Sequence, residues 1–171
     1  VFAVRSAPPL DDAALRAIKR VDDGVAPRAR AAARLAAARA FGSLNQFDRA
    51  WELLGTCIEL AKAEAGVLVR ARAFELELAA RAGDFARAEK AADALEGGAL
   101  PEDPILLLGI GFVRAAAGKH DAARIAAARA EAIPVDESDL VLGVTRHRRF
   151  GLVHAYLRDF AAARAEQIRT V

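Results

Sequence analysis

The sequence predicts an all-α fold, a superhelix of about four antiparallel helix hairpins preceded by one N-terminal helix. The first observation is composition: 54% of the 171 residues are apolar but only 6% are aromatic. Alanine is the commonest apolar residue and favours helices, whereas the aromatic and β-branched residues that favour strands are scarce. The second observation is an internal repeat, whose length is that of a helix-turn-helix unit.

The repeated segment has an aromatic residue or histidine followed three residues later by alanine. Successive anchors are separated by 38, 35 and 40 residues. Gly83 and Gly118 precede two anchors and suit the left-handed conformation that ends a helix, while an Asp beside each anchor suits the start of the next helix. Asn45 replaces the turn glycine in the first unit. The four anchors are Phe47, Phe85, His120 and Phe160.

Taken in order, the chain begins with a helix near Asp11–Val21, which has Asp11 and Asp12 at its favourable end and Gly24 after it. We interpret residues 1–26 as an N-terminal segment belonging to a truncated repeat, and residues 27–171 as the helical repeat domain. Unit boundaries are expected at Gly66, at Gly97–Gly98 and at Pro134. The helices predicted in the repeat domain are 27–43, 46–65, 67–82, 84–96, 103–117, 119–132, 137–157 and 159–170.

Small apolar residues continue from each anchor at helical spacing, as in Phe85, Ala88, Ala92 and Leu95. Alanine at such positions lets two helices approach closely, as a stacked hairpin array requires. The last helix differs because Gln167 and Thr170 stand where the other units carry small apolar residues. Such a polar face indicates either a terminal cap or an atypical unit of an array that continues.

The third and fourth units resemble the tetratricopeptide repeat family. The resemblance covers residues 28–170, although the second unit departs from the pattern in its first helix. Related α-solenoid families with slightly longer units share these features. The resemblance implies a right-handed solenoid in which the first helix of each hairpin lines a concave groove. The residues that carry it are Leu107, Ile110, Gly111, Ala123, Ala127 and Pro134, and then Phe150, Gly151, Phe160 and Ala163.

The resemblance also implies which side chains line the groove. In the second unit, four of them follow helical spacing and mix charge with an aromatic ring, as in grooves that bind peptides or helices. The alternative is that these are ordinary solvent-facing charges and core phenylalanines. The Lys and Asn pair with which some relatives clamp a C-terminal carboxylate is missing. The expected groove residues are Arg39, Arg70, Phe74, Glu77, Arg81, Phe112, Arg149 and Tyr156.

No motif predicts catalysis, a metal site or a cofactor. His147 and His154 share a helix face but lie about 10 Å apart along its axis, too far for one metal ion to bridge. His120 fills a slot that holds an aromatic ring in the other units. Cys57 lies on a packing stripe without a neighbouring base, so we expect a buried thiol and no nucleophile. The chain is not expected to be an enzyme.

Charge is nearly balanced, with 25 Lys and Arg against 23 Asp and Glu interspersed along the chain. Neither nucleic acid nor a membrane is required as a partner, and the longest apolar run, Ile105–Val113, is about half a bilayer span. The basic cluster Arg146–Arg149 points in nearly every direction on a helix, so we interpret it as a solvated helix end. One cysteine and no secretory signal favour the cytoplasm.

The leading hypothesis is therefore a protein-interaction scaffold, a piece of a larger protein, that binds a peptide or helix of acidic character in the groove. An alternative is a sensing or oligomerisation segment of a larger multidomain transcription or signalling regulator, which leaves self-association open. A third alternative, a nucleic-acid-binding solenoid, predicts an affinity that falls steeply with salt.

Overall fold

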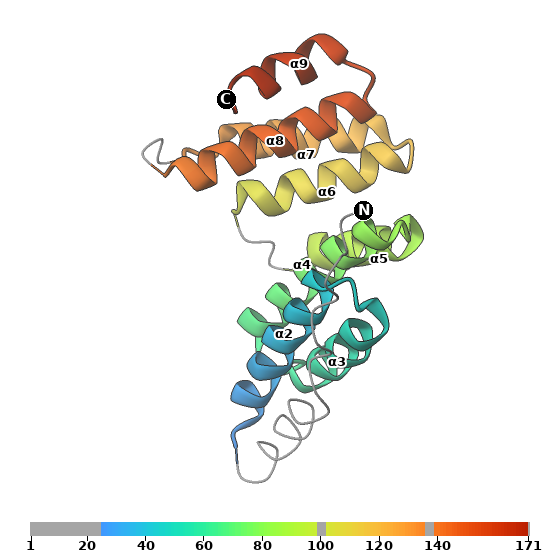
Figure 1. The fold of residues 1–171 in the computed structure, drawn as a ribbon, viewed down its shortest axis with the longest axis vertical. Helices are drawn as coiled ribbons and strands as arrows, with labels where there is room; N and C mark the ends of the chain where they lie inside the picture. The colour runs from blue at the N-terminus through green and yellow to red at the C-terminus, as the bar shows by residue number, and fades with distance from the viewer. Residues whose placement is uncertain (1–24, 99–101, 136–138, 171) are drawn as a thin grey trace, which may run out of the picture. The chain divides into compact units, whose positions relative to one another are not determined.

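The structure is a computed structural model that describes residues 25–98, 102–135 and 139–170. Within these residues all regular structure is α-helical, which confirms the predicted all-α class (Figure 1). The helix predicted near Asp11–Val21 lies outside the described residues. The described helices are α2 (Pro27–Ser43), α3 (Phe47–Leu60), α4 (Ala65–Ala82), α5 (Phe85–Glu96), α6 (Pro104–Ala116), α7 (His120–Ala132), α8 (Leu140–Tyr156) and α9 (Phe160–Ile168).

The chain divides into two compact units, Val1–Ala71 and Arg72–Val171. In the first unit α2 packs along α3. In the second, α6 packs along α7 and α8 along α9, and α6 also contacts both α5 and α8 (Figure 1). Helices that follow each other in sequence therefore pack largely as hairpins. The expected repeat domain, residues 27–171, includes helices of both units.

The four hairpin turns share one hydrogen-bond pattern. At Gly118 the backbone has φ of +78°, the N–H of Lys119 donates to Arg114 O at 2.8 Å, and the N–H of Gly118 donates to Ala115 O at 3.0 Å. This is a Schellman ending, in which a left-handed residue returns two N–H groups to the last turn of the helix. The predicted turns are thereby confirmed. In the other three turns, the left-handed residues are Asn45, Gly83 and Arg158, respectively.

Aspartates cap several of the helices that follow these turns and loops. The carboxylate of Asp84 accepts a hydrogen bond from the N–H of Arg87 at 3.0 Å, and Asp159 accepts one from the N–H of Ala162 at 3.1 Å. Such caps satisfy backbone donors that have no partner within the helix. All four repeat anchors are the first residues of their helices, α3, α5, α7 and α9, although α3 and α7 begin after Gln46 and Lys119 without a side-chain cap.

One predicted boundary is wrong. Gly66 was expected to separate two units, but it is the second residue of α4, and α3 ends five residues earlier than predicted, at Leu60. The N–H of Ala61 closes α3, and Glu64 O then accepts the first backbone hydrogen bonds of α4 from Val67 and Leu68. A glycine keeps its backbone hydrogen bonds but costs conformational entropy in a helix, and this cost is best tolerated in the first turn, where the helix is least constrained. All other described helix ends lie within three residues of the predicted ones.

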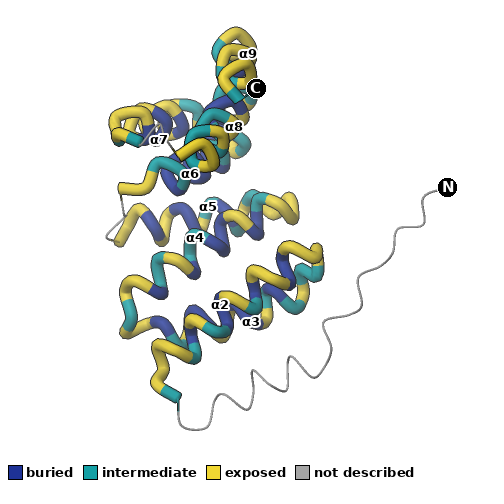
Figure 2. The backbone as a smooth tube through the Cα atoms, turned by 60° about the vertical axis from the view of Figure 1, so that its left-hand side comes forward, coloured by how far each residue is buried: buried dark blue, intermediate teal, exposed yellow. Residues whose placement is uncertain are grey.

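Close packing explains the small residues in the helices. A Cβ atom at Gly111 would lie 3.4 Å from Ala123 O and 3.5 Å from Ala126 Cβ, which is ordinary van der Waals contact, so the space between α6 and α7 here admits a methyl group and little more. Figure 2 shows buried residues recurring between exposed ones along α2 to α7, whereas α9 is mostly exposed. The core shared by α6, α7 and α8 consists of Leu107, Leu108, Ala127, Ala130, Phe150 and Val153.

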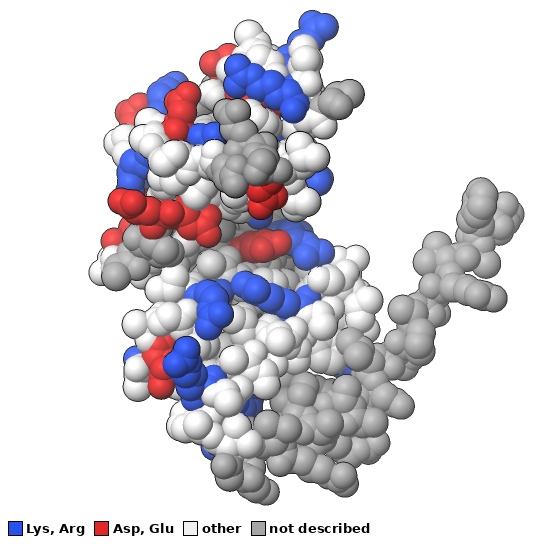
Figure 3. Space-filling view, turned by 90° about the vertical axis from the view of Figure 1, so that its left-hand side faces the viewer, with Lys and Arg blue, Asp and Glu red and all other residues white. Residues whose placement is uncertain are grey.

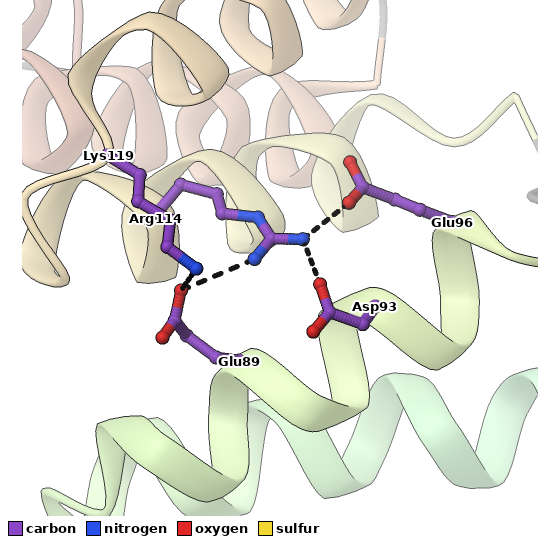
Figure 4. Close-up of polar contacts among 5 residues, drawn as sticks. All are labelled: Glu89, Asp93, Glu96, Arg114 and Lys119. Atoms are coloured by element: carbon purple, nitrogen blue, oxygen red, sulfur yellow. Dashed lines mark hydrogen bonds and ion pairs between the residues drawn. The ribbon is translucent and has the colours of Figure 1, made fainter.

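A buried ion-pair network joins α5 to α6 (Figure 4). Arg114 of α6 has a side chain only 7% exposed, and it contacts carboxylates of α5 at 2.5 Å (Asp93), 2.6 Å (Glu96) and 3.3 Å (Glu89). Lys119 also contacts Glu89, at 2.6 Å. Burial alone would lower the pKa of Arg114, but the hydrogen bonds to Asp93 and Glu96 outweigh this and raise it above its ordinary value.

Candidate functional site: a groove lined by α4, α6 and α8

Residues of α4, α6 and α8, all of them in the unit Arg72–Val171, line one groove with a volume of about 440 Å³. Each of these helices is the first helix of a hairpin, and none of the lining residues belongs to the second helices α5, α7 and α9. The lining residues are Leu76, Glu77, Ala80 and Arg81 of α4, Leu108, Gly109 and Phe112 of α6, and Val144, Thr145, Arg148, Arg149 and Leu152 of α8.

The floor of the groove is apolar because buried leucines of α4 and α6 line it. Leu76 and Leu108 are almost completely buried, whereas Leu152 on the α8 wall is 44% exposed. Gly109 makes room between these walls. A Cβ atom at Gly109 would lie 3.2 Å both from Leu76 Cδ2 and from Arg149 Nη1. The guanidinium group of Arg149 therefore reaches across α6 where a larger residue would displace it.

The charges of the groove are unequal. Glu77 and Arg81 stand on α4, and Arg148 and Arg149 on α8, so three guanidinium groups face one carboxylate. Within the described part of the chain, no ion pair involves Glu77, Arg148 or Arg149. These charges are thus available to a bound molecule, and the α8 wall attracts anionic groups.

Four of the eight expected groove residues line this groove, namely Glu77, Arg81, Phe112 and Arg149. Tyr156 lies beside it, with its ring edge-on to that of Phe112 at a centroid distance of 5.0 Å. Tyr156 itself lines a second hollow at the hairpin turns, together with His120 and Phe160. The expected aromatic contribution of α6 and α8 is therefore present, but it is divided between two hollows.

Phe74 does not line the groove, which corrects the expectation from the sequence. Its side chain is only 5% exposed. On a helix, Phe74 is rotated about 60° from Glu77, and that rotation is enough to carry it from the exposed face of α4 into the core. Arg39 and Arg70 are exposed residues of the unit Val1–Ala71 and are not among the lining residues.

The residues that sequence reasoning missed are mostly apolar. Thr145 and Leu152 share one face of α8 with Arg149 and Tyr156, at the helical spacing i, i+4, i+7 and i+11. That spacing was a usable signal. The spacing does not by itself separate groove residues from core residues, because leucine and valine in a helix pattern are usually assigned to the core.

The side chains of the basic cluster Arg146–Arg149 diverge as predicted, but the cluster does not lie at a helix end. Arg146 donates to Glu131 O at 3.1 Å, and His147 Nδ1 lies 2.7 Å from Glu166 Oε2. Arg148 and Arg149 instead line the groove. The side chains thus diverge as expected, but the interpretation as a solvated helix end is wrong, because the cluster occupies the middle of α8 and contacts both α7 and α9.

Cys57 and His154 both contact neighbouring groups of the protein. Cys57 is fully buried, its Sγ donates to Ala31 O at 3.2 Å, and burial raises the pKa of its thiol. His154 stacks on Phe150 at a centroid distance of 6.3 Å. In residues 25–98, 102–135 and 139–170, no three His, Cys, Asp or Glu side chains gather as a metal site would require. No helix in the same ranges has the length and apolar character needed to cross a bilayer.

No protein-family model matches the chain, no curated protein is significantly similar to it in sequence, and no solved structure is significantly similar to it. Function must therefore be inferred from the groove and its side chains.

Proposed function

We propose that the chain is a tetratricopeptide-like interaction scaffold and that its groove binds a peptide or helix of a partner protein. The observation that carries this proposal is the origin of the groove residues. Every one of them comes from the first helix of a hairpin, as the resemblance implies for a binding surface, and they come from three successive hairpins.

The chemistry of the groove supports the same function. Binding sites for protein segments combine an apolar floor with a few charged groups that orient the ligand. Here Leu76 and Leu108 provide the floor and Leu152 provides an exposed apolar rim. Glu77 on the α4 wall and Arg148 and Arg149 on the α8 wall have no ion-pair partner among the described residues. A surface built from helices that pack on one another is preformed, so little ordering cost opposes binding.

The test compares how much partner protein is captured by the wild-type chain and by a variant of the full chain with a substitution in one wall of the groove. Leu152→Glu places a charge on the apolar rim and, because Leu152 is 44% exposed, should leave the fold intact. Ile125→Glu is the matched control, since Ile125 is 63% exposed on α7 and lies outside the groove. Both variants should unfold at the same temperature as the wild type.

Immobilised wild type and both variants are incubated with lysate from the source cell, and bound proteins are quantified by mass spectrometry. We expect at least one protein whose recovery falls tenfold or more with Leu152→Glu and is unchanged with Ile125→Glu. If every recovered protein binds equally to the wild type and to Leu152→Glu, the groove is not the binding surface.

A further inference from the structure

We infer that the occupant of the groove is an amphipathic helix of a partner protein that places a carboxylate one helical turn from a large apolar side chain. This inference rests on the proposed function and specifies its ligand. Three features of the groove support it. They are the side chains that could hydrogen-bond to the backbone of an occupant, the arrangement of the charges, and the volume.

The scarcity of hydrogen-bond acceptors favours a helix over an extended peptide. An extended segment has backbone N–H and C=O groups that must find partners when they are buried. The walls of the groove are helices, whose own backbone groups are already paired, and among the lining side chains only Glu77 and Thr145 can accept from the N–H groups of an extended backbone. A helical occupant satisfies its own backbone and needs only side-chain contacts.

The spacing on α8 specifies the acidic residue. Leu152 lies one turn beyond Arg148 and Arg149, so apolar and cationic groups are separated by about 6 Å along the helix axis. A second helix lying along α8 matches this spacing when its apolar residue and its Asp or Glu are three or four positions apart. Arg148 and Arg149 have no carboxylate partner among the described residues, so both are free to pair with it.

The same charges exclude the groove of a second copy as the occupant. In a two-fold dimer, each groove would face an identical one. Four arginine side chains, Arg148 and Arg149 from each copy, would then face only two Glu77 side chains. Like charges in such an interface repel, so self-association through this surface is opposed and an acidic partner is favoured.

The volume agrees with a helix that enters the groove partway. A helix about 10 Å across with a rise of about 5.4 Å per turn occupies roughly 420 Å³ per turn. The groove offers about 440 Å³, which corresponds to one turn fully inserted or to two turns inserted by half. Two turns contain the apolar residue, the acidic residue and one further apolar position.

The probe is a displayed library of random 14-residue segments, selected on the full 171-residue chain and counter-screened on Leu152→Glu and Ile125→Glu. We expect enriched segments that bind the wild type and Ile125→Glu but not Leu152→Glu. They should place Leu, Ile, Met or Phe three or four positions from Asp or Glu, without an internal proline, and should become helical when bound, as measured by circular dichroism.

A charge exchange then tests the acidic contact. Binding of an enriched peptide should fall at least tenfold with Arg148→Glu and recover when its acidic residue is replaced by Lys. The control is Arg164→Glu, because Arg164 is exposed on α9 away from the groove, and it should leave binding unchanged. Failure of the lysine peptide to recover binding overturns the acidic assignment.

The outcomes separate this inference from the proposed function. Enriched segments that need Leu152 but are proline-rich, extended or basic overturn the helical acidic ligand and leave a peptide-binding groove. Segments that bind the wild type and Leu152→Glu equally overturn both. A wild-type dimer in sedimentation that Leu152→Glu dissociates assigns the groove to a second copy and also overturns the inference.

Discussion

At the residue scale, the described part of the chain buries three charged side chains, Arg34, Glu75 and Arg114. A buried charge is tolerated only when it is paired and hydrogen-bonded, because desolvation costs several kcal/mol. Arg114 meets this requirement with three carboxylates of α5, and they remain partly exposed. The network therefore fixes how α5 lies against α6, whatever its net contribution to stability.

Replacing Arg114 by methionine should lower the free energy of unfolding by about 1 to 3 kcal/mol. Breaking a fully buried pair typically costs about 3 to 5 kcal/mol, but Asp93 and Glu96 are exposed enough here to regain water. Urea denaturation followed by circular dichroism measures the change. Arg124→Met is the matched control, because Arg124 is exposed and pairs with the exposed Asp121, and it should change stability by less than about 0.5 kcal/mol. Equal effects of the two substitutions would contradict a structural role of the network.

Most of the hairpin geometry could be predicted at the scale of single elements, because local residue types determine it. The left-handed turn residues, the aspartate caps and the anchor at the start of each second helix are local features. The predicted end of α3 is wrong because neither Ala61 nor Lys62, which follow the helix, is a type of residue that usually ends one. Gly66 was a misleading signal, since a glycine in the first turn of a helix resembles one that ends it.

Alanine at the contact between α6 and α7 sets how closely these helices approach. Ala123 is fully buried, so Ala123→Leu should overpack this contact and destabilise the protein by about 1 to 3 kcal/mol. Ala122→Leu, at the exposed neighbouring position of the same helix, should change stability by less than about 0.5 kcal/mol. Thermal unfolding measures both variants. Identical melting temperatures would mean that Ala123 does not limit the approach of the two helices.

At the scale of the whole molecule, the sequence alone could give only part of the groove. Charged positions such as Glu77 and Arg149 could be placed by helical spacing, because exposure follows the face of a helix. Whether Phe74 faces the groove or the core depends on which neighbours cover α4, and a single helix pattern does not contain that information. The position of Gly109, where Arg149 crosses α6, likewise depends on packing between hairpins.

Charge over the whole molecule bears on whether the proposed groove could instead bind nucleic acid. The net charge of the chain is only +2. On the face drawn in Figure 3, Lys and Arg lie interspersed with Asp and Glu. A protein that neutralises six to ten phosphates loses about 10³ to 10⁵ in affinity between 50 and 200 mM salt. The groove has only three arginines, and apolar contacts supplement them.

The affinity for an enriched acidic peptide should therefore fall by less than about tenfold between 50 and 200 mM salt, because salt screens the arginine contacts but not the apolar ones. Fluorescence anisotropy with a labelled peptide measures this dependence. A labelled 20-base-pair duplex serves as the comparison, and at 50 mM salt it should bind more weakly than the peptide. Tighter binding of the duplex, with the steep salt dependence of phosphate contacts, would reverse the assignment, since only a surface that aligns many more cations than this groove could produce it.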